Sequence, residues 1–184
     1  MNTSLKLTVR EYDEMVAKGA FDGLSQKIEL IEGEIHAMNP AGPRHDHIIE
    51  FLTHWSVSNT DFNVVRVRVQ SGLSLPDQES RLEPDVLWVK ADHPTDRHPI
   101  ADEVLLLIEV GDSSIDVDRQ RKADLYGRAG IPEYWVVNVG EQVIHVFRDP
   151  TASGYGTMKT IPSGKRRTSL SVPSAELDPG ELFR

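Results

Sequence analysis

The order of hydrophobic and polar residues along this chain predicts a mixture of helices and strands. Stretches with helix end signals or apolar residues at helical spacing alternate with shorter stretches of strand character. Helices are expected near residues 8–18, 45–57 and 116–129. Strands are expected at 28–31, 34–38, 61–70, 85–89, 104–110, 134–139 and 142–148, with one or two short strands beyond them. A mixed central β-sheet flanked by helices, an α/β fold, accommodates this order.

Local signals define several of these elements. Thr8 and Glu11 form a capping box at the start of the first helix. Glu32 and Gly33 separate two short apolar runs and predict a tight hairpin. In the stretch 61–70 the valines alternate with Arg66, Arg68 and Gln70, which predicts a half-buried strand with a basic outer face. The segment between residues 90 and 103 is predicted to be an exposed loop.

Composition narrows the class of protein. The chain has 184 residues, which favours one domain, with a core at about 7–148 and C-terminal strands in 149–184. Its 20 Lys and Arg against 29 Asp and Glu give a net charge of −9, which argues against nucleic-acid binding by bulk basicity. There is no cysteine, no signal-peptide pattern and no apolar run long enough to span a bilayer, so we expect a cytoplasmic protein without a membrane segment.

A carboxylate within an apolar strand is the most informative feature. Glu109 follows the run 104–108, and an ionised carboxylate in such a strand needs a compensating partner. If this strand pairs antiparallel with residues 85–89, with Val89 opposite Leu105, then Asp85 faces Glu109 on the same side of the sheet. Two carboxylates so placed favour a bound cation, and ligation by oxygen alone favours Mg²⁺ or Mn²⁺. The alternatives are a solvated or Arg-paired Glu109 and a turn role for Asp85.

The next helix supplies further candidates. Asp118, Lys122 and Tyr126 are spaced i, i+4 and i+8 and therefore share one helical stripe. Because this helix follows Glu109 closely, its first turns can lie over the acids, where Lys122 could orient a water or stabilise charge on a phosphate. The alternative is that Asp118 and Lys122 form only a helix-stabilising pair.

These residues resemble the PD-(D/E)XK nuclease superfamily and, within it, the mainly bacterial Uma-two family of predicted restriction endonucleases. The resemblance covers roughly Leu7 to Arg148 and lies in the order and spacing of several short motifs. They are Ile28–Ile35, Pro84-Asp85-Val86, Ile108-Glu109-Val110, and the run from Asp118 through Lys122 and Tyr126 to Trp135. The resemblance implies a restriction-endonuclease-like core and metal-dependent hydrolysis of phosphodiester bonds.

The same resemblance implies roles for individual residues. Asp85 and Glu109 match the two metal-binding acids, and the carbonyl of Val110 would be a further ligand. The superfamily's lysine falls two residues after the second acid, where this chain has Gly111, and Lys122 is expected to replace it. Glu29 and His47 match auxiliary positions, and Gln70 is a candidate substrate contact.

The sequence thus predicts a Mg²⁺- or Mn²⁺-dependent endonuclease whose substrate is nucleic acid, with DNA favoured, and which could act as a homodimer. Candidate phosphate contacts are Arg66, Arg68, Arg121 and the cluster 165–167. The rival hypothesis is a catalytically inactive nuclease-like module that mediates protein association, which Gly111 favours. A zinc hydrolase is disfavoured because His45 and His47, at i and i+2 of a helix, point apart.

Overall fold

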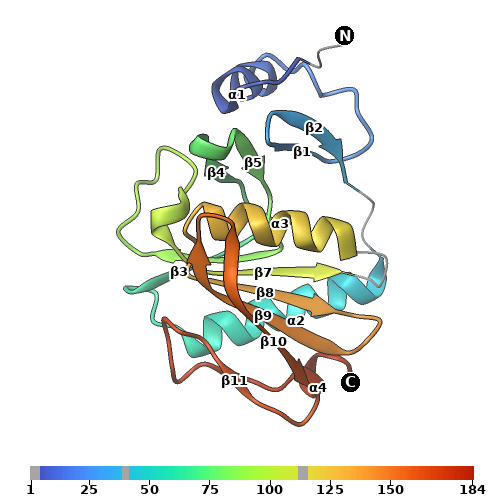
Figure 1. The fold of residues 1–184 in the computed structure, drawn as a ribbon, viewed down its shortest axis with the longest axis vertical. Coiled ribbons are helices and arrows are strands. Elements are labelled where there is room, and N and C mark those ends of the chain that lie inside the picture. Colours follow the sequence, from blue (N-terminus) through green and yellow to red (C-terminus); the bar gives the residue numbers. More distant parts are fainter. Residues whose placement is uncertain (1–4, 39–41, 112–115) are drawn as a thin grey trace.

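The computed structural model of the chain describes residues 5–38, 42–111 and 116–184 and builds them around a six-stranded mixed sheet (Figure 1). Its strand order is β10-β9-β8-β7-β6-β3, with β7 and β8 parallel and all other neighbours antiparallel. The strands are β3 Val65–Val69, β6 Val86–Lys90, β7 Val104–Gly111, β8 Glu133–Asn138, β9 Val143–Thr151 and β10 Gly154–Pro162. This is the mixed α/β architecture that the sequence predicts.

Smaller elements surround this sheet. A four-stranded antiparallel sheet has the order β2-β1-β5-β4, and a two-stranded sheet pairs β11 with β12. These strands are β1 Ile28–Ile31, β2 Glu34–Ala37, β4 Leu73–Leu75, β5 Ser80–Leu82, β11 Arg167–Thr168 and β12 Glu176–Leu177. The helices are α1 Val9–Ala17, α2 Pro43–Asn59, α3 Asp116–Arg128 and α4 Pro179–Leu182, and short 3₁₀ turns are η1 Pro76–Gln78 and η2 Ala101–Glu103.

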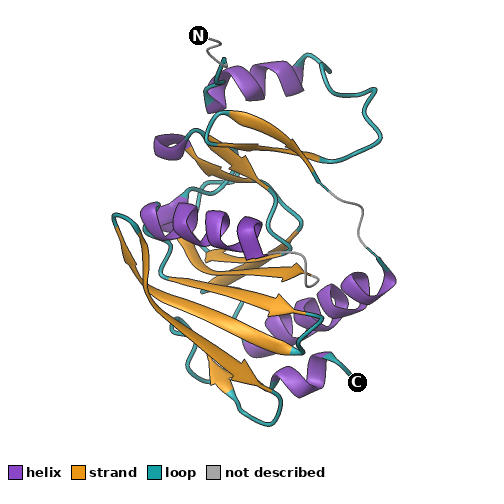
Figure 2. Cartoon of the chain, turned by 45° about the vertical axis from the view of Figure 1, so that its right-hand side comes forward, coloured by secondary structure: helices purple, strands orange, loops and turns teal. Residues whose placement is uncertain are grey.

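The two faces of the large sheet are covered by different helices (Figure 2). Strand β7 shows why: Ile108 packs into the core that α2 and the C-terminal segment complete, whereas Leu107 packs into the core beneath α3. On the α2 side, the ring of Trp55 lies 5.4 Å from that of Trp88 and 5.8 Å from that of Trp135. Because successive residues of a strand point to opposite faces, each of the two cores receives alternate residues of the same strands.

The predicted local signals are confirmed. Thr8 and Glu11 form the capping box of α1, with the Thr8 N–H donating to Glu11 Oε2 at 2.8 Å. Strands β1 and β2 form the predicted hairpin, and its turn residues Glu32 and Gly33 both have positive φ, at 51° and 82°. Two consecutive positive φ values are what a type I′ turn requires.

At the end of the sheet that carries the acids, β6 pairs with β7 in the predicted register. Val86 pairs with Ile108 and Trp88 with Leu106. A bulge between Trp88 and Val89 then shifts the register, so Val89 lies opposite Val104 and not opposite Leu105 as predicted. Because the bulge lies beyond Trp88, it leaves the pairing next to Asp85 unchanged.

Other expectations need correction. Strands β4 and β5 lie in a segment for which the sequence predicted no element, because each has only three residues and Pro76 separates them. Strand β10 has nine residues, whereas the sequence predicted only short strands in this region. The prediction was too short because β10 is an edge strand whose residues are mostly exposed and form no apolar stripe. His93, in the predicted exposed loop, is buried.

No helix within the described parts of the chain combines the length and the hydropathy needed to cross a membrane.

The close approach of α3 to β10 gives a test of this packing. A Cβ added at Gly127 in α3 would lie 2.7 Å from the Cα of Gly154 and closer still to its carbonyl group. We therefore expect Gly127→Ala to lower the free energy of unfolding by about 1–3 kcal/mol, although alanine normally favours a helix over glycine. Gly23→Ala is the control, because nothing lies within 4 Å of the added Cβ. Urea unfolding measures both, and a Gly127→Ala chain as stable as the parent would contradict the packing.

Candidate active site

The structure brings Asp85 and Glu109 together at the end of the β6–β7 pair. Asp85 directly precedes β6, and continuing the Val86–Ile108 pairing by one residue places it opposite Glu109. The backbone N–H of Val110 donates to Asp85 Oδ2 at 2.8 Å, which ties the Asp85 carboxylate to β7. The N–H of Gln70 donates to the Asp85 carbonyl at 3.0 Å, so the end of β3 lies alongside as well.

Helix α3 supplies two donors to Glu109. The Tyr126 hydroxyl donates to Glu109 Oε1 at 2.9 Å, and Lys122 Nζ lies 3.1 Å from Oε1 and 3.3 Å from Oε2. Lys122 and Tyr126 are one helical turn apart, as the predicted stripe requires. The third residue of that stripe, Asp118, has its side chain outside the described residues.

A second buried carboxylate shares the same lysine. Glu29 in β1 is 2% exposed, and its Oε2 lies 3.1 Å from Lys122 Nζ. Its Oε1 accepts the backbone N–H of Glu83 at 2.9 Å. The ammonium of Lys122 thus lies between a strand of the small sheet and a strand of the large sheet, with α3 carrying it.

Burial and neighbouring charges shift the pKa values of this group. Burial raises the pKa of Glu109 to about 7; Lys122 opposes this shift, and Asp85 and Glu29 add to it. Burial acts to lower the pKa of Lys122, but the negative charges of Glu109 and Glu29 outweigh it and raise that pKa above its ordinary value. Lys122 is therefore a cation at neutral pH. Burial also raises the pKa of Tyr126, which keeps its hydroxyl proton to donate.

The helix α2 brings His45 to the acids, not His47. His45 Nε2 lies 3.3 Å from Asp85 Oδ2, and this hydrogen bond raises the pKa of His45 against the effect of its burial. His47 is exposed, and within the described residues its ring makes no hydrogen bond or ion pair. The helical spacing in the sequence could have identified His45. It precedes the buried Ile49 and Leu52 by four and seven residues and therefore lies on the same inward-facing stripe of the helix.

Most of the predicted phosphate contacts are engaged within the chain. Arg121 lies 3.4 Å from Glu32 and 3.7 Å from Glu34 of the β1–β2 hairpin. The guanidinium of Arg66 lies 4.2 Å from the ring centre of Phe62.

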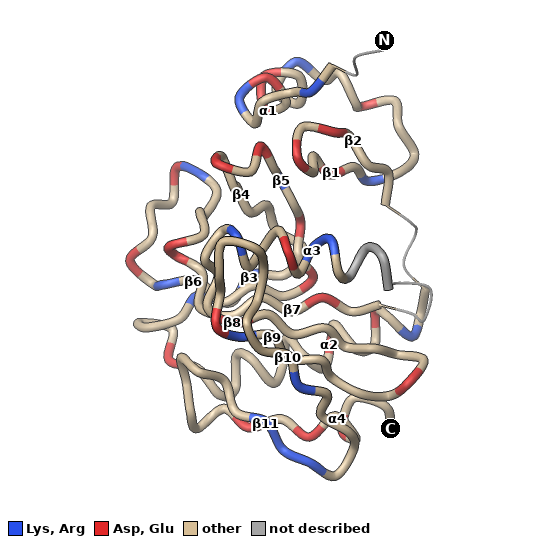
Figure 3. Tube along the Cα trace, viewed as in Figure 1, with Lys and Arg blue, Asp and Glu red and all other residues tan. Residues whose placement is uncertain are grey.

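Arg68 donates to the buried His93, with Nη2 2.8 Å from Nε2. The basic cluster 165–167 lies beside β11, away from α3 (Figure 3), and its neighbouring strand β12 packs into the core on the α2 side of the sheet. Gln70, the other predicted substrate contact, is exposed at the end of β3.

The raised pKa of Glu109 has a consequence for stability. The folded chain holds the Glu109 proton up to about pH 7, whereas the unfolded chain releases it near 4.5, so the free energy of unfolding should fall as the pH rises through this window. This shift is worth at most about 3–4 kcal/mol. Glu109→Gln should flatten the decline, and the exposed Glu50→Gln should leave it intact. Urea titrations from pH 4 to 8 measure the slopes; parallel curves for the parent and Glu109→Gln would contradict the shift.

Comparison with known proteins places the chain in a family. Residues 9–180 match a family model, Uma2, described as "Putative restriction endonuclease". A solved structure of a "putative nuclease belonging to DUF820" from Anabaena variabilis is similar over 96% of this chain and 97% of that chain, with a TM-score of 0.74 and 16% identity, and so shares the fold. No curated protein matches the chain. The family that the motifs predicted is confirmed, and the chain belongs to the Uma2 family of restriction-endonuclease-like proteins.

Proposed function

We propose that this protein is a metal-dependent nuclease that hydrolyses phosphodiester bonds of DNA with Mg²⁺ or Mn²⁺ as cofactor. The observation that carries the proposal is the placement of the Lys122 ammonium against Glu109, beside Asp85, in a family of restriction endonucleases. Metal-dependent hydrolysis of a phosphodiester needs acids that hold the cation and a positive charge that stabilises the phosphate oxygens, and two acids and a lysine lie together here. The endonuclease activity, the choice of DNA and the cofactor are all part of the proposal.

The residues at the site fit a hard divalent cation. The donors are all oxygens: the carboxylates of Asp85 and Glu109 and the carbonyl of Val110. Among the described residues, no hydrogen bond reaches Asp85 Oδ1, which leaves an oxygen available. No group of three or more His, Asp and Glu suited to a metal occurs in the described residues. A site of two acids is nevertheless typical for Mg²⁺, which keeps several water ligands and takes others from phosphates.

A bound divalent cation would polarise the phosphoryl oxygen and lower the pKa of a coordinated water. The chain's own residues have separate tasks. Lys122, which holds its proton at neutral pH, donates to oxygens of the phosphate on which charge develops and does not serve as a base. Tyr126 and Lys122 together fix the orientation of the Glu109 carboxylate, and Val110 and His45 fix that of Asp85.

The rival hypothesis of an inactive module rests on Gly111, which stands where the superfamily has its lysine. The contact of Lys122 with Glu109 supports activity, because the ammonium reaches the second acid from α3 instead of from β7. The two hypotheses differ in the effect of replacing Lys122. An active nuclease should lose metal-dependent cleavage, whereas an inactive module has no cleavage to lose.

Metal binding can be tested without a substrate. Because a ligand that binds only the folded state stabilises it, Mn²⁺ at about 100 times its Kd should add about 2.7 kcal/mol and raise the Tm by roughly 5–10 °C. Glu109→Ala should lose this increase, whereas the exposed control Glu50→Gln should keep it. Thermal melts with and without Mn²⁺ measure the difference. Equal increases in the parent and Glu109→Ala would rule out this site.

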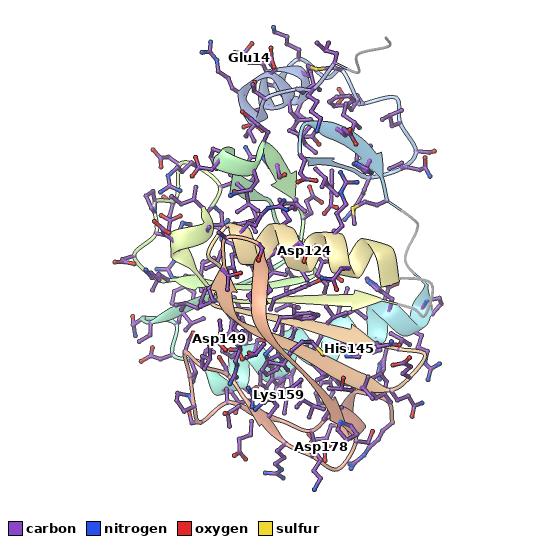
Figure 4. All side chains as sticks on the ribbon, viewed as in Figure 1. Glu14, Asp124, His145, Asp149, Lys159 and Asp178 are labelled. Carbon is purple, nitrogen blue, oxygen red and sulfur yellow. The ribbon has the colours of Figure 1, made fainter. Side chains whose placement is uncertain are left out.

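Cleavage tests the role of Lys122. Lys122→Met should lower the rate of Mn²⁺-dependent plasmid nicking by about 10²-fold or more, because the donor to the phosphate is lost. Lys159→Met is the matched control: Lys159 is exposed on β10 (Figure 4), on the opposite face of the sheet from Glu109, and the variant should cleave at the parent rate. Absence of nicking by the parent chain would favour the inactive module, whereas nicking by Lys122→Met at the parent rate would rule out the role proposed for Lys122.

A further inference from the structure

Gln70 has a strained backbone conformation beside the acid pair. Its φ is 45°, in the left-handed region that costs a residue with a Cβ roughly 1–2 kcal/mol. Its N–H donates to the Asp85 carbonyl at 3.0 Å, so the strain occurs next to one of the acids. The side chain is exposed, and within the described residues its amide makes no hydrogen bond. Packing within the chain therefore does not account for a glutamine at this position.

Three of the other four described non-glycine residues with positive φ have side chains with a role inside the fold. Glu32 Oε1 accepts from Arg128 at 2.7 Å, and Asp149 Oδ2 accepts from Thr157 at 2.8 Å. Glu79 Oε2 accepts the N–H of Val9 at 2.7 Å and so caps the first turn of α1.

Gln142, at φ 57°, is the second exposed glutamine in this conformation, and it lies in the turn between β8 and β9. It therefore offers the same residue type and the same backbone conformation at a position in a different turn.

The topology places Gln70 on the flank of the site. Strand β3 pairs with β6, which pairs with β7, so Gln70, Asp85 and Glu109 lie side by side at the same end of three neighbouring strands. Strand β3 is one of the two edges of the large sheet, the one opposite β10. A polymer with a phosphate at the acids would continue past them, and a neighbouring nucleotide on this side would lie over the end of β3.

The chemistry of the side chain suits this position. A carboxamide offers both a donor and an acceptor, and it can bind a phosphate oxygen or the edge of a base. Being neutral, it adds no negative charge to a site that already holds Asp85, Glu109 and Glu29, and it does not compete with Lys122 for those acids.

On the basis of the proposed function, we propose that Gln70 is a substrate-contacting residue whose amide hydrogen-bonds the nucleotide bound beside the acid pair. Strain of this kind is concentrated at functional sites, where the ligand contact outweighs the cost in stability.

The test separates the amide from the backbone. Gln70→Ala removes the amide and keeps a Cβ in the strained conformation, whereas Gln70→Gly removes both. The affinity for a fluorescein-labelled 20-base-pair DNA duplex is measured by anisotropy in EDTA, where no divalent cation supports cleavage. Both variants should bind about three- to tenfold more weakly, the effect of losing one hydrogen bond. Gln70→Gly should in addition raise the Tm by about 2–4 °C through the relief of strain.

Gln142→Gly is the control, because it relieves the same strain away from the site. It should raise the Tm in the same way and leave the affinity for DNA unchanged. Parent affinity in both Gln70 variants would overturn the inference, and so would a loss confined to Gln70→Gly, which would point to backbone mobility. If the parent chain binds no DNA, the proposed function fails and this inference fails with it. If the parent binds DNA and both Gln70 variants bind it with the same affinity, only this inference fails and the proposed function stands.

Discussion

The ammonium of Lys122 is the interaction on which the site and part of the fold depend. It lies 3.1 Å from Glu29 in the small sheet and 3.1 Å from Glu109 in the large sheet. The carboxylates of Glu29, which is buried, and Glu109, which is partly buried, would be strongly destabilising so near each other without a cation between them, and Asp85 adds a third negative charge. A single charge on α3 therefore holds two sheets and a helix together at the point where the chemistry is proposed to occur.

This arrangement explains how the chain can carry glycine where the superfamily has its lysine. A lysine two residues after Glu109 would approach the acids along the same strand. Here the ammonium approaches from above the strand, because α3 packs across the face of the sheet to which Glu109 points. Gly111 leaves no side chain at the end of β7. Under the proposed function, Lys122 supplies from α3 the positive charge that the superfamily's lysine supplies from the strand.

The arrangement of charge also reconciles a net charge of −9 with the proposed nucleic-acid substrate. Several arginines form ion pairs within the protein. Arg121 and Arg128 pair with Glu32 of the hairpin, and Arg148 pairs with the fully buried Glu133. The two pairs with Glu32 connect elements distant in the sequence, and the pair with Glu133 connects the neighbouring strands β8 and β9. Under the proposed function, recognition at the acids therefore falls to Lys122 and to neutral groups such as Gln70 and does not depend on an excess of positive charge.

Much of the fold and the acid pair could be predicted from the sequence, because they depend on local and periodic signals. The capping box at Thr8, the turn at Glu32 and Gly33, and the alternation in the strands each follow from a few neighbouring residues. The apolar run before Glu109 has a counterpart before Lys90, and their register placed Asp85 opposite Glu109. The helical spacing of Lys122 and Tyr126 made both available to the same acid.

Only the tertiary structure decided the rest. The short strands β4 and β5 carry too few residues for a periodic signal, and they are strands because β5 pairs with β1 on one side and with β4 on the other. The spacing along α2 places His45 on its inward stripe, but the contact of His45 with Asp85 depends on how α2 docks on the sheet. The sharing of Lys122 with Glu29 depends on where the small sheet packs. Contacts between segments far apart in the sequence follow from how elements dock, and the spacing of residues along one element does not contain that information.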